Sequence, residues 1–508
     1  MAATQSHTAS GPPVPTIRQQ QHYIDGVFRD SVDGATFATL NPTDNRVLAE
    51  VAAGDGADVE RAVTAARRAF DEGPWPRLKA SERAAALRRI AQLLRDHADD
   101  FIGLEVLDIG MPIAQMRGLA ARAADNFDYF AGVITELSGR AYKVGEEFLN
   151  YTIHKPVGVA GLIMPWNAPL MLSTWRIAPC LAAGNTIVLK PAEWSPLTAT
   201  RLAELIDEAG LPAGVFNVVH GYGETAGAPL SAHPGVQLIC FTGETLTGRT
   251  IMEAAAATLK RLSMELGGKS PVVVFEDCDF DRALDAAVFQ IFSMNGQRCT
   301  AGSRVLVQDA LYERFVEGMA ARAAAIRVGD PFDPSTELGP LIRSEHLGRV
   351  LGYIESARRD GAQVRAGGGP PEQLRDTGGN FLGATVLADV TPQMRVFREE
   401  IFGPVVTVTP FRGEADAIRM ANDTEYGLAA YVWTRDGQRA HRVAQAIETG
   451  MCWINSQNVR DLRTPFGGVK GSGIGREGGD YSFEFYCDLE TVQVALGEHR
   501  VPRLGAQP

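Results

Sequence analysis

The sequence has few cysteines, and they form no pattern that marks a metal centre or a disulfide framework. Six cysteines are scattered over 508 residues, and no C-x-x-C pair or histidine cluster accompanies them. Scattered cysteines of this kind are typical of reduced thiols in a cytoplasmic protein. We therefore expect a cytoplasmic location and no metal.

Long apolar runs are also missing, as is an excess of positive charge. No segment approaches the roughly 20 apolar residues that span a membrane. The first twenty residues form a polar tail without the apolar core of a signal peptide. The formal net charge of −12 argues against a nucleic-acid partner. These absences leave a globular protein whose partners are neither membranes nor nucleic acids.

The composition that is present, with 45% hydrophobic and 22% charged residues, is that of an ordinary globular protein. A chain of 508 residues is too long for one core and indicates two or three domains. From Val157 onward, apolar strand candidates alternate with helical stretches, which predicts a parallel sheet covered by helices. A second such series starts at Pro271. Two further strand-like stretches, 147–154 and 483–494, fit neither series and could pair with each other or reach another subunit.

Cys299 differs from the other cysteines because it lies in a polar, glycine-bounded loop beside Arg298. A helix is expected over 281–294 before this loop, and a strand over 304–308 after it. A nearby positive charge favours the thiolate and so makes a cysteine nucleophilic. An inert cysteine is the alternative, but inert cysteines usually lie in apolar runs. The sequence therefore predicts that Cys299 is a nucleophile activated by Arg298.

Three other positions could contribute chemistry. Glu265 precedes a Gly-Gly turn, which suits a general base, or it is a surface carboxylate paired with Lys269. Asn167 stands between two prolines after a strand, where its amide could stabilise an oxyanion or close an Asx turn. Lys190 and Glu193 follow the next strand and could hold ribose hydroxyls, although a solvated strand end is the simpler interpretation.

The segment 241–250 has the glycine spacing of a phosphate-binding P-loop but lacks its lysine, and Glu244 would place a negative charge inside it. We therefore exclude a nucleoside triphosphatase. Backbone N–H groups near Gly243 could still face a pyrophosphate. A looser glycine-rich turn runs from Gly221 to Gly227.

Taken together, these segments resemble the aldehyde dehydrogenase superfamily over about residues 20–498. The motifs that carry the resemblance occur in the family's order: Pro165-Trp166-Asn167, Lys190-Pro191-Ala192-Glu193, Phe241-Thr242-Gly243, Glu265-Leu266-Gly267-Gly268-Lys269-Ser270, Gly296-Gln297-Arg298-Cys299, Glu399-Glu400-Ile401-Phe402-Gly403-Pro404 and Pro465-Phe466-Gly467-Gly468.

The resemblance implies an α/β fold with two parallel-sheet domains. We expect a tail over 1–20, a Rossmann-like cofactor domain over 21–142 and 157–265, and a catalytic domain over 266–475. A small β-segment over 143–156 and 480–498 would serve oligomerisation, which implies a homodimer or homotetramer. The helix expected over 81–96 would begin with Ser81 as its N-cap.

The resemblance also assigns roles. Cys299 becomes the nucleophile, Glu265 the base that releases the acid from a thioester, and Asn167 the oxyanion donor together with the Cys299 backbone N–H. The implied cofactor is NAD, because Glu193 would repel the 2′-phosphate of NADP. The positions expected to contact it are Met164, Pro165, Trp166, Lys190, Glu193, Gly223, Gly227, Phe241, Thr242, Gly243, Glu244, Thr247, Leu266, Gly267, Glu400 and Phe402. Glu244 departs from the serine that many relatives carry, which leaves its role open.

The segment 458–465 resembles the branch of this family that oxidises muconic semialdehydes from aromatic-ring catabolism. Arg460 and Arg463, with Arg122, could clamp a substrate carboxylate beside Phe466. Alternatively these arginines form ion pairs with neighbours such as Asp461, in a broad-specificity or betaine-type aldehyde dehydrogenase. A cysteine esterase and a non-catalytic nucleotide-binding protein are more remote alternatives.

Overall fold

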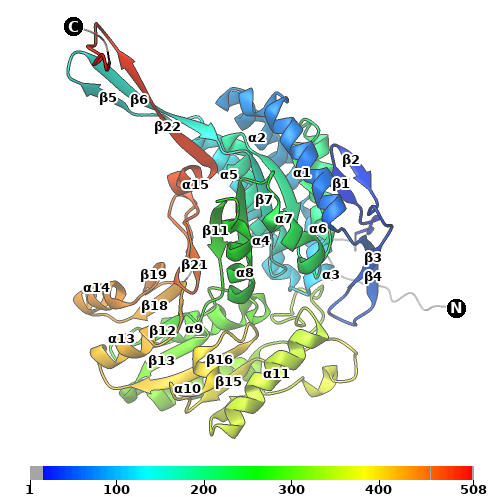
Figure 1. The fold of residues 1–508 in the computed structure, drawn as a ribbon. Coiled ribbons are helices and arrows are strands. Elements are labelled where there is room, and N and C mark those ends of the chain that lie inside the picture. The colour runs from blue at the N-terminus through cyan, green and yellow to red at the C-terminus, as the bar shows by residue number, and fades with distance from the viewer. Residues whose placement is uncertain (1–14, 458, 506–508) are drawn as a thin grey trace, which may run out of the picture.

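The structure, a computed structural model, describes residues 15–457 and 459–505. Most of the expected tail, together with Asn458, therefore lies outside the described residues. Two sheets, each covered by helices on both faces, lie one above the other, and a third, small sheet projects as an arm (Figure 1). We call each large sheet with its helices a lobe. The α/β fold class expected from the sequence is confirmed.

The first sheet has the strand order β2-β1-β9-β8-β7-β10-β11-β21. Its five central strands are parallel, whereas the two strands at one edge and the single strand at the other are antiparallel to their neighbours. The strands are β1 (His22–Ile24), β2 (Val27–Arg29), β7 (Val159–Ile163), β8 (Thr186–Lys190), β9 (Phe216–Val218), β10 (Leu238–Thr242), β11 (Arg261–Glu265) and β21 (Gly473–Ile474).

Two apolar clusters bury the faces of this sheet. One face is covered by α2 (Ala80–Asp96), α4 (Ile113–Val133), α5 (Pro169–Ala183) and α6 (Leu197–Glu208), the other by α1 (Gly56–Asp71), α7 (Ala228–Ala232) and α8 (Thr245–Ala256). The N-cap of α2 is Lys79 and not Ser81, so that prediction is wrong. Glu82 reaches back to accept a hydrogen bond from the Lys79 backbone at 2.7 Å, which starts the helix before Ser81.

The second sheet has the order β14-β15-β16-β13-β12-β18-β19, with all neighbours parallel except β14. Its strands are β12 (Pro271–Val274), β13 (Arg304–Gln308), β14 (Gln363–Ala366), β15 (Thr385–Ala388), β16 (Val405–Phe411), β18 (Ala429–Trp433) and β19 (Met451–Ile454). The covering helices are α9 (Phe280–Phe292), α10 (Tyr312–Ala325), α11 (Ser344–Arg359), α13 (Glu414–Asn422) and α14 (Gly437–Ala446).

The two sheets meet end to end at the place where the candidate site forms. Glu265 ends β11, and only residues 266–270 separate it from Pro271 at the start of β12. Pro271 lies opposite Arg304, the first residue of β13, so the loop that contains Cys299 enters the sheet beside it. The carboxyl ends of the first sheet therefore face the amino ends of the second. We call this boundary the seam.

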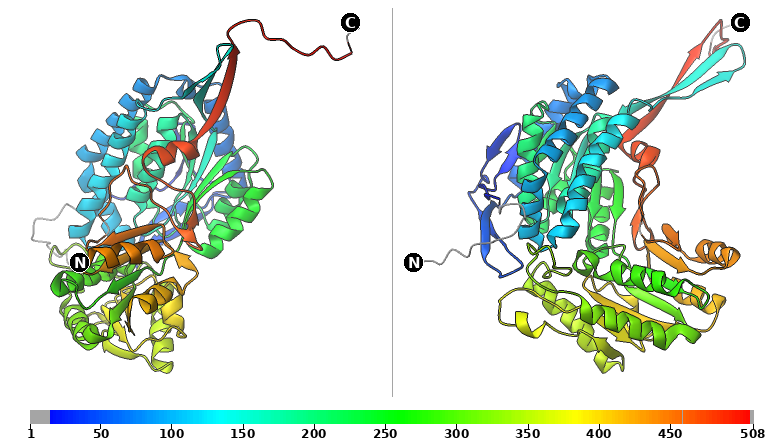
Figure 2. Two further views of the ribbon diagram at one scale, coloured as in Figure 1. Left: turned by 90° about the vertical axis from the view of Figure 1, so that its left-hand side faces the viewer. Right: turned by 180° about the vertical axis from the view of Figure 1, so that it is seen from behind.

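The arm is the antiparallel sheet β22-β6-β5, and it points away from the second lobe in every view (Figure 2). Its strands are β5 (Ala141–Val144), β6 (Phe148–Pro156) and β22 (Cys487–Ala495). The two orphan stretches thus pair with each other, as one of the two expectations held. The strand predicted from residue 483 is wrong at its start, because Phe483 and Tyr486 belong to α15 (Gly479–Tyr486) and are buried in the core of the first lobe.

No helix in the described ranges combines the length and apolar character needed to cross a membrane.

Candidate active site

The loop that carries Cys299 leaves α9 through three consecutive residues with left-handed backbone. Met294, Asn295 and Gly296 have φ angles of 54°, 55° and 68°. A Cβ at Gly296 would lie 2.3 Å from the carbonyl carbon of Gly403, so only glycine allows this approach of two backbones. Left-handed backbone at non-glycine residues is costly and often marks a functional site. The turn brings Cys299 to the seam.

The environment of Cys299 does not favour a resting thiolate. Burial, followed by the Glu265 and Glu400 carboxylates, raises the pKa of the Cys299 thiol to about 12. Arg298 opposes this shift, but its guanidinium donates hydrogen bonds to the Gln290 carbonyl at 2.9 Å and to Ser293 Oγ at 3.2 Å. Arg298 thus lowers the pKa of the thiol, as the sequence predicts, but burial and the two carboxylates outweigh its effect. The thiol needs a base at the moment of attack.

Glu265 has the properties of such a base. Its side chain is 5% exposed, and neither carboxylate oxygen has a hydrogen-bond partner among the described residues. Burial raises the pKa of Glu265 to about 7, although Arg176, Arg460 and Arg476 lower it. The alternative of a surface glutamate paired with Lys269 is excluded, because both side chains are buried and neither has a partner in the described chain.

Asn167 lies four residues after the end of β7, just before α5, and its side chain reaches across the seam. Its side chain is buried, and Nδ2 donates a hydrogen bond to the Gln297 carbonyl at 2.9 Å. Gln297 is two residues before Cys299, so the amide is held against the loop that carries the sulfur. The second amide hydrogen of Asn167 is not used by this bond and can point to a ligand.

Four strand ends of the first sheet converge on the same edge because the strands are parallel. Ile163 lies opposite Lys190 and Phe241, and Thr242 lies opposite Glu265. This register brings together most of the positions expected to hold the cofactor: Met164, Pro165 and Trp166 after β7, Lys190 and Glu193 after β8, Phe241 and Thr242 in β10, Gly243, Glu244 and Thr247 before and within α8, and Leu266 and Gly267 after β11.

Lys190 and Glu193 form an ion pair with Nζ and Oε2 2.9 Å apart, and the lysine is almost fully buried. A Cβ on Gly227 would lie 4.0 Å from Lys190 Cδ, so the Gly223–Gly227 turn packs beside it. Glu244 turns toward the second lobe, where its carboxylate lies 3.6 Å from the Arg349 guanidinium. Its charge is thus partly offset by a cation from the other lobe.

Glu400 and Phe402 enter the seam from the second lobe. Glu400 accepts a hydrogen bond from the Gly268 backbone at 2.8 Å, and a Cβ on Gly267 would lie 2.5 Å from its other oxygen. The Phe402 ring packs edge-on against Trp166, with centroids 5.3 Å apart. Gly267 thus leaves room for the Glu400 carboxylate beside the end of β11, and a Cβ on Gly268 would lie 2.4 Å from the Cys299 carbonyl oxygen.

These residues fit a nicotinamide dinucleotide. Lys190 offers a donor and Glu193 an acceptor to a ribose diol, and Glu400 offers a second carboxylate near the Phe402 and Trp166 rings. The N-terminus of α8 directs backbone N–H groups toward the same edge. The buried Lys269 amine has no hydrogen-bond partner in the described chain, and burial lowers its pKa to about 7. In its charged form it lowers the pKa of Glu400.

Arg460 lies close enough to Cys299, Glu265 and Arg122 for their charges to shift its pKa, whereas Arg463 lies apart from this group. The Arg460 guanidinium lies 3.8 Å from the Phe466 ring centroid and 5.0 Å from that of Trp175. Burial, followed by repulsion from Arg122, lowers the pKa of Arg460 to about 10. The exposed Arg463 instead holds Asp461 with two hydrogen bonds of 2.9 and 2.6 Å.

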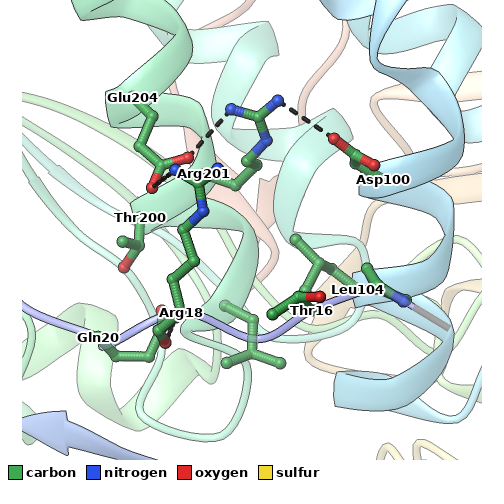
Figure 3. A pocket seen from close by; sticks show the side chains of 10 residues that line it. Thr16, Arg18, Gln20, Asp100, Leu104, Thr200, Arg201 and Glu204 are labelled. Atoms are coloured by element: carbon green, nitrogen blue, oxygen red, sulfur yellow. Dashed lines mark hydrogen bonds and ion pairs between the residues drawn. The ribbon is translucent and has the colours of Figure 1, made fainter.

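Another cavity, of about 190 Å³, lies between the N-terminal segment, α3 (Ala98–Ile109) and α6 (Figure 3). Its charges neutralise each other: Arg201 pairs with Asp100 and Glu204, and Arg18 pairs with Glu204. This cavity holds none of the predicted site residues. Within the described ranges, no group of three or more metal-ligating side chains gathers in one place.

The aldehyde dehydrogenase family matches residues 28–492 of this sequence. The chain belongs to the aldehyde dehydrogenase family. Among curated relatives, 5-carboxymethyl-2-hydroxymuconate semialdehyde dehydrogenase from Escherichia coli is 50% identical over 472 residues, which cover 92% of this chain and 99% of the relative. The 2-hydroxymuconic semialdehyde dehydrogenase of Pseudomonas sp. strain CF600 is 43% identical, covering 94% of this chain and all of the relative.

Solved structures agree with this membership. The crystal structure of HpcC from Thermus thermophilus superposes with a TM-score of 0.94 at 53% identity, covering 96% of this chain and 95% of the other. PnpE from Pseudomonas sp. WBC-3, also solved in complex with nicotinamide adenine dinucleotide, superposes with a TM-score of 0.93 at 43% identity, covering 96% and 100%. The chain is thus an aldehyde dehydrogenase, an enzyme that oxidises aldehydes.

Arg176, which lies behind Glu265, was not predicted from the sequence. It is the only charged residue of α5, and it is buried in an ion pair with Glu477 and a 2.8 Å hydrogen bond to Ser263. A lone charge in an apolar helix is the signal that could have identified it, because buried charges need a partner. Its positive charge lowers the pKa of Glu265, against the effect of burial.

Proposed function

We propose that this aldehyde dehydrogenase oxidises a carboxylated, unsaturated semialdehyde of the muconic type from aromatic-ring catabolism to the acid, with NAD as the electron acceptor. The observation that carries this proposal is the Arg460 guanidinium, which stacks on the Phe466 and Trp175 rings while its charge acts on Cys299 and Glu265. A partly buried guanidinium without a carboxylate partner is stabilised when an anion binds to it, and the charge of Arg122 adds to this attraction. Both relatives described above act on semialdehydes of this kind, as their names state.

The substrate carboxylate would bind Arg460 and Arg122, which leaves the aldehyde group at Cys299. The Phe466 and Trp175 rings hold the Arg460 guanidinium by stacking, so the bidentate geometry is prepared before the substrate arrives. Arg463 does not take part in this proposal because its guanidinium group is already paired with the Asp461 carboxylate. The alternative of structural ion pairing thus describes Arg463 and not Arg460.

The chemistry begins at the sulfur of Cys299, which attacks the aldehyde carbon. Glu265, whose pKa is about 7, takes the thiol proton, since no other carboxylate at the seam is equally free of hydrogen bonds in the described chain. Asn167 Nδ2 and the Cys299 backbone N–H stabilise the oxyanion of the thiohemiacetal. When bound, NAD accepts the hydride that leaves this carbon, and a thioester to Cys299 remains.

The thioester is then hydrolysed. Glu265 removes a proton from water, the resulting hydroxide attacks the thioester carbonyl, and the acid leaves as the sulfur regains its charge and then a proton. Glu265 can serve twice once it has released the thiol proton to solvent, and no fixed donor among the described residues then occupies its oxygens.

In this proposal Lys190 and Glu193 of the first lobe bind the adenosine ribose of the cofactor. Glu400 and Phe402 of the second lobe meet its nicotinamide end. Glu193 favours NAD over NADP, because a 2′-phosphate would meet its carboxylate at the same hydroxyl. Glu244 would stand beside the pyrophosphate with its charge directed to Arg349. The second lobe supplies the nucleophile.

We also assign the arm to the oligomer, a homodimer or homotetramer. β22 forms an edge of its sheet over nine residues, and Leu489 on it is 62% exposed. Such an edge pairs readily with another chain. The six free thiols agree with a cytoplasmic location.

Arg460→Ala tests the substrate assignment. We expect kcat/KM for a muconic semialdehyde to fall by about 10- to 100-fold, the value of a charged hydrogen-bond pair. For a neutral aldehyde such as hexanal, kcat/KM should change by less than about threefold, because no carboxylate is lost. Steady-state rates of NADH formation with both substrates measure this.

The matched control is Arg463→Ala, which should affect neither substrate appreciably. An equal loss on both substrates in Arg460→Ala would show that Arg460 supports the loop and does not recognise an anion.

A further inference from the structure

Asn295 joins the two lobes at the root of the nucleophile loop. Its side chain is fully buried and makes three hydrogen bonds. Nδ2 donates to the Gly110 carbonyl at 2.9 Å and to the Pro340 carbonyl at 3.0 Å, and Oδ1 accepts from the Gly339 backbone at 2.8 Å. Gly110 ends α3 in the first lobe, whereas residues 339–340 belong to the second.

The backbone of Asn295 is also unusual, since its φ of 55° lies in the left-handed region. Asparagine tolerates this conformation better than most residues, and three hydrogen bonds hold it in place. The neighbouring contacts are close: a Cβ on Gly339 would lie 2.0 Å from the Gly110 carbonyl oxygen. The junction therefore has little room to shift.

The same helix holds the oxyanion side of the site. Glu105 of α3 is buried and accepts a 2.6 Å hydrogen bond from the Leu170 backbone in the first turn of α5, three residues after Asn167. α3 thus fixes Asn167 through Glu105, and it fixes the loop of Cys299 through Asn295. A single helix, α3, therefore positions Cys299 relative to Asn167, although the two residues come from different lobes.

We propose that Asn295 is a positioning residue that sets the distance between Cys299 and Asn167 by anchoring the nucleophile loop to the end of α3. This inference rests on the proposed function of Cys299 as nucleophile. Asn295 touches neither substrate nor cofactor in this role and acts through the backbone of residues 296–299. Its loss lets the loop move and admits water to the sulfur.

The test uses Asn295→Asp, which keeps the shape but loses both donors, and Asn295→Gly, which accepts the left-handed backbone but loses all three bonds. We expect kcat to fall by about 10- to 100-fold, the cost of a misplacement of about 1 Å, with KM for NAD changed by less than about threefold. Without cofactor, the pH midpoint for iodoacetamide alkylation of Cys299, followed by peptide mass spectrometry, should move down by about one unit or more as burial is relieved.

Asn45 offers a matched control. It lies in the turn between β3 (Thr36–Leu40) and β4 (Val47–Ala52), which form a separate two-stranded sheet, and its backbone is also left-handed, with φ of 57°. Its Nδ2 donates to the Gly378 carbonyl at 2.6 Å and to Asn380 Oδ1 at 2.9 Å in the second lobe. Asn45→Gly should lower the thermal midpoint about as much as Asn295→Gly does, yet keep kcat and the alkylation midpoint at their wild-type values.

The inference is overturned if Asn295→Gly keeps kcat within about twofold of wild type with an unchanged alkylation midpoint. It is equally overturned if Asn45→Gly produces the same changes as Asn295→Gly, because the effect then belongs to lobe contact in general. Cys299→Ala distinguishes a failure of the proposed function from a failure of the Asn295 inference. An active Cys299→Ala enzyme contradicts the proposed function itself, whereas an inactive one leaves the Asn295 result decisive.

Discussion

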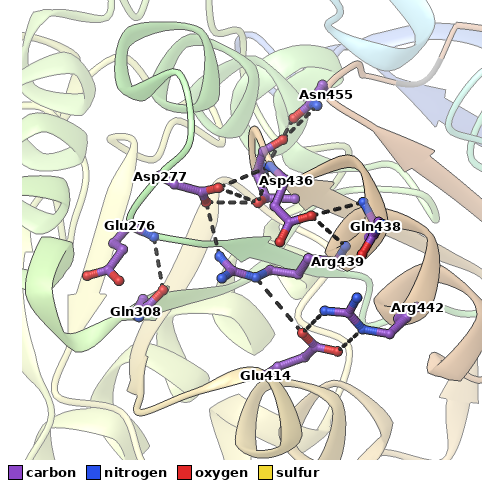
Figure 4. Close-up of polar contacts among 10 residues, drawn as sticks. Glu276, Asp277, Gln308, Glu414, Asp436, Gln438, Arg439, Arg442 and Asn455 are labelled. Atoms are coloured by element: carbon purple, nitrogen blue, oxygen red, sulfur yellow. Dashed lines mark hydrogen bonds and ion pairs between the residues drawn. The ribbon is translucent and has the colours of Figure 1, made fainter.

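Charged groups at the two ends of the strands of the second sheet differ in whether the protein itself provides their partners. We call the carboxyl ends of these strands the far edge. At the far edge, beyond the carboxyl ends of β12 and β18, the Asp277 carboxylate accepts hydrogen bonds from Thr434 Oγ1, from the Asp436 backbone and from Arg439 (Figure 4). Glu414 similarly holds Arg442 at 2.9 and 2.8 Å. The charges of this edge are completed by the protein itself.

At the seam, by contrast, Glu265 and Lys269 are buried without a hydrogen-bond partner among the described residues. Buried polar groups are nearly always satisfied, so unsatisfied ones in a folded protein call for an explanation. Here the explanation is a ligand, which provides the hydrogen-bond partners that the described chain does not. The comparison teaches that unpaired buried charge, more than the number of charges, distinguishes a reacting edge from a structural one.

Of the variants that compare the seam with the far edge, Cys299→Ala should have the largest effect on kcat. Removal of the nucleophile is expected to lower kcat for aldehyde oxidation by at least about 10⁴-fold, while the Kd for NAD, measured by fluorescence quenching, stays within about twofold. Cys278→Ala is the matched control at the far edge, where burial and the neighbouring aspartates raise the pKa of the thiol to about 11. A comparable loss in Cys278→Ala would mean that the thiols act through stability and not through chemistry.

Glu193→Ser should have an intermediate effect, on cofactor choice. With the carboxylate removed, we expect kcat/KM with NADP to rise by about tenfold, roughly the value of one relieved charge contact. Glu414→Gln, which removes a paired carboxylate from the far edge, should leave the ratio of NADP to NAD rates unchanged. If Glu193→Ser leaves it unchanged as well, Glu193 does not meet the ribose.

Asp277→Asn should have the smallest effect. The Asp277 network is partly exposed, so its weakening is expected to lower the free energy of unfolding by about 1 kcal/mol or less, without a change in kcat. Urea unfolding and a steady-state assay measure the two quantities. A large loss of activity would show that the far edge is coupled to the seam.

Much of this architecture is predictable from the sequence because strand signals are local. The strand predicted over 304–308 coincides with β13, and the alternation of strands with helices gives the two parallel sheets. Helix α3 escapes prediction because every residue from Phe101 to Ile109 is buried, so no amphipathic period marks it. Yet α3 is the element that connects the two sides of the site.

The sequence predicts which residues form the site better than it predicts how those residues interact. Proximity in sequence predicts that Arg298 activates Cys299, but the direction of a side chain depends on partners such as Gln290, which only the fold provides. The same reason separates Arg460 from Arg463, which look equivalent in the segment 458–465. One stacks between two rings, and the other pairs with Asp461.

The central claim is that Glu265 serves as the base that releases the acid, and rapid mixing of Glu265→Gln with NAD and a muconic semialdehyde tests it most directly. We expect a burst of up to one NADH per active site, slower than in the wild type because Glu265 also takes the thiol proton, followed by a steady rate at least about 100-fold below wild type. The wild-type steady rate should rise with pH through about 7, as Glu265 loses its proton, and the variant should lose this dependence. A variant with normal steady turnover and an unchanged pH profile would contradict this role of Glu265.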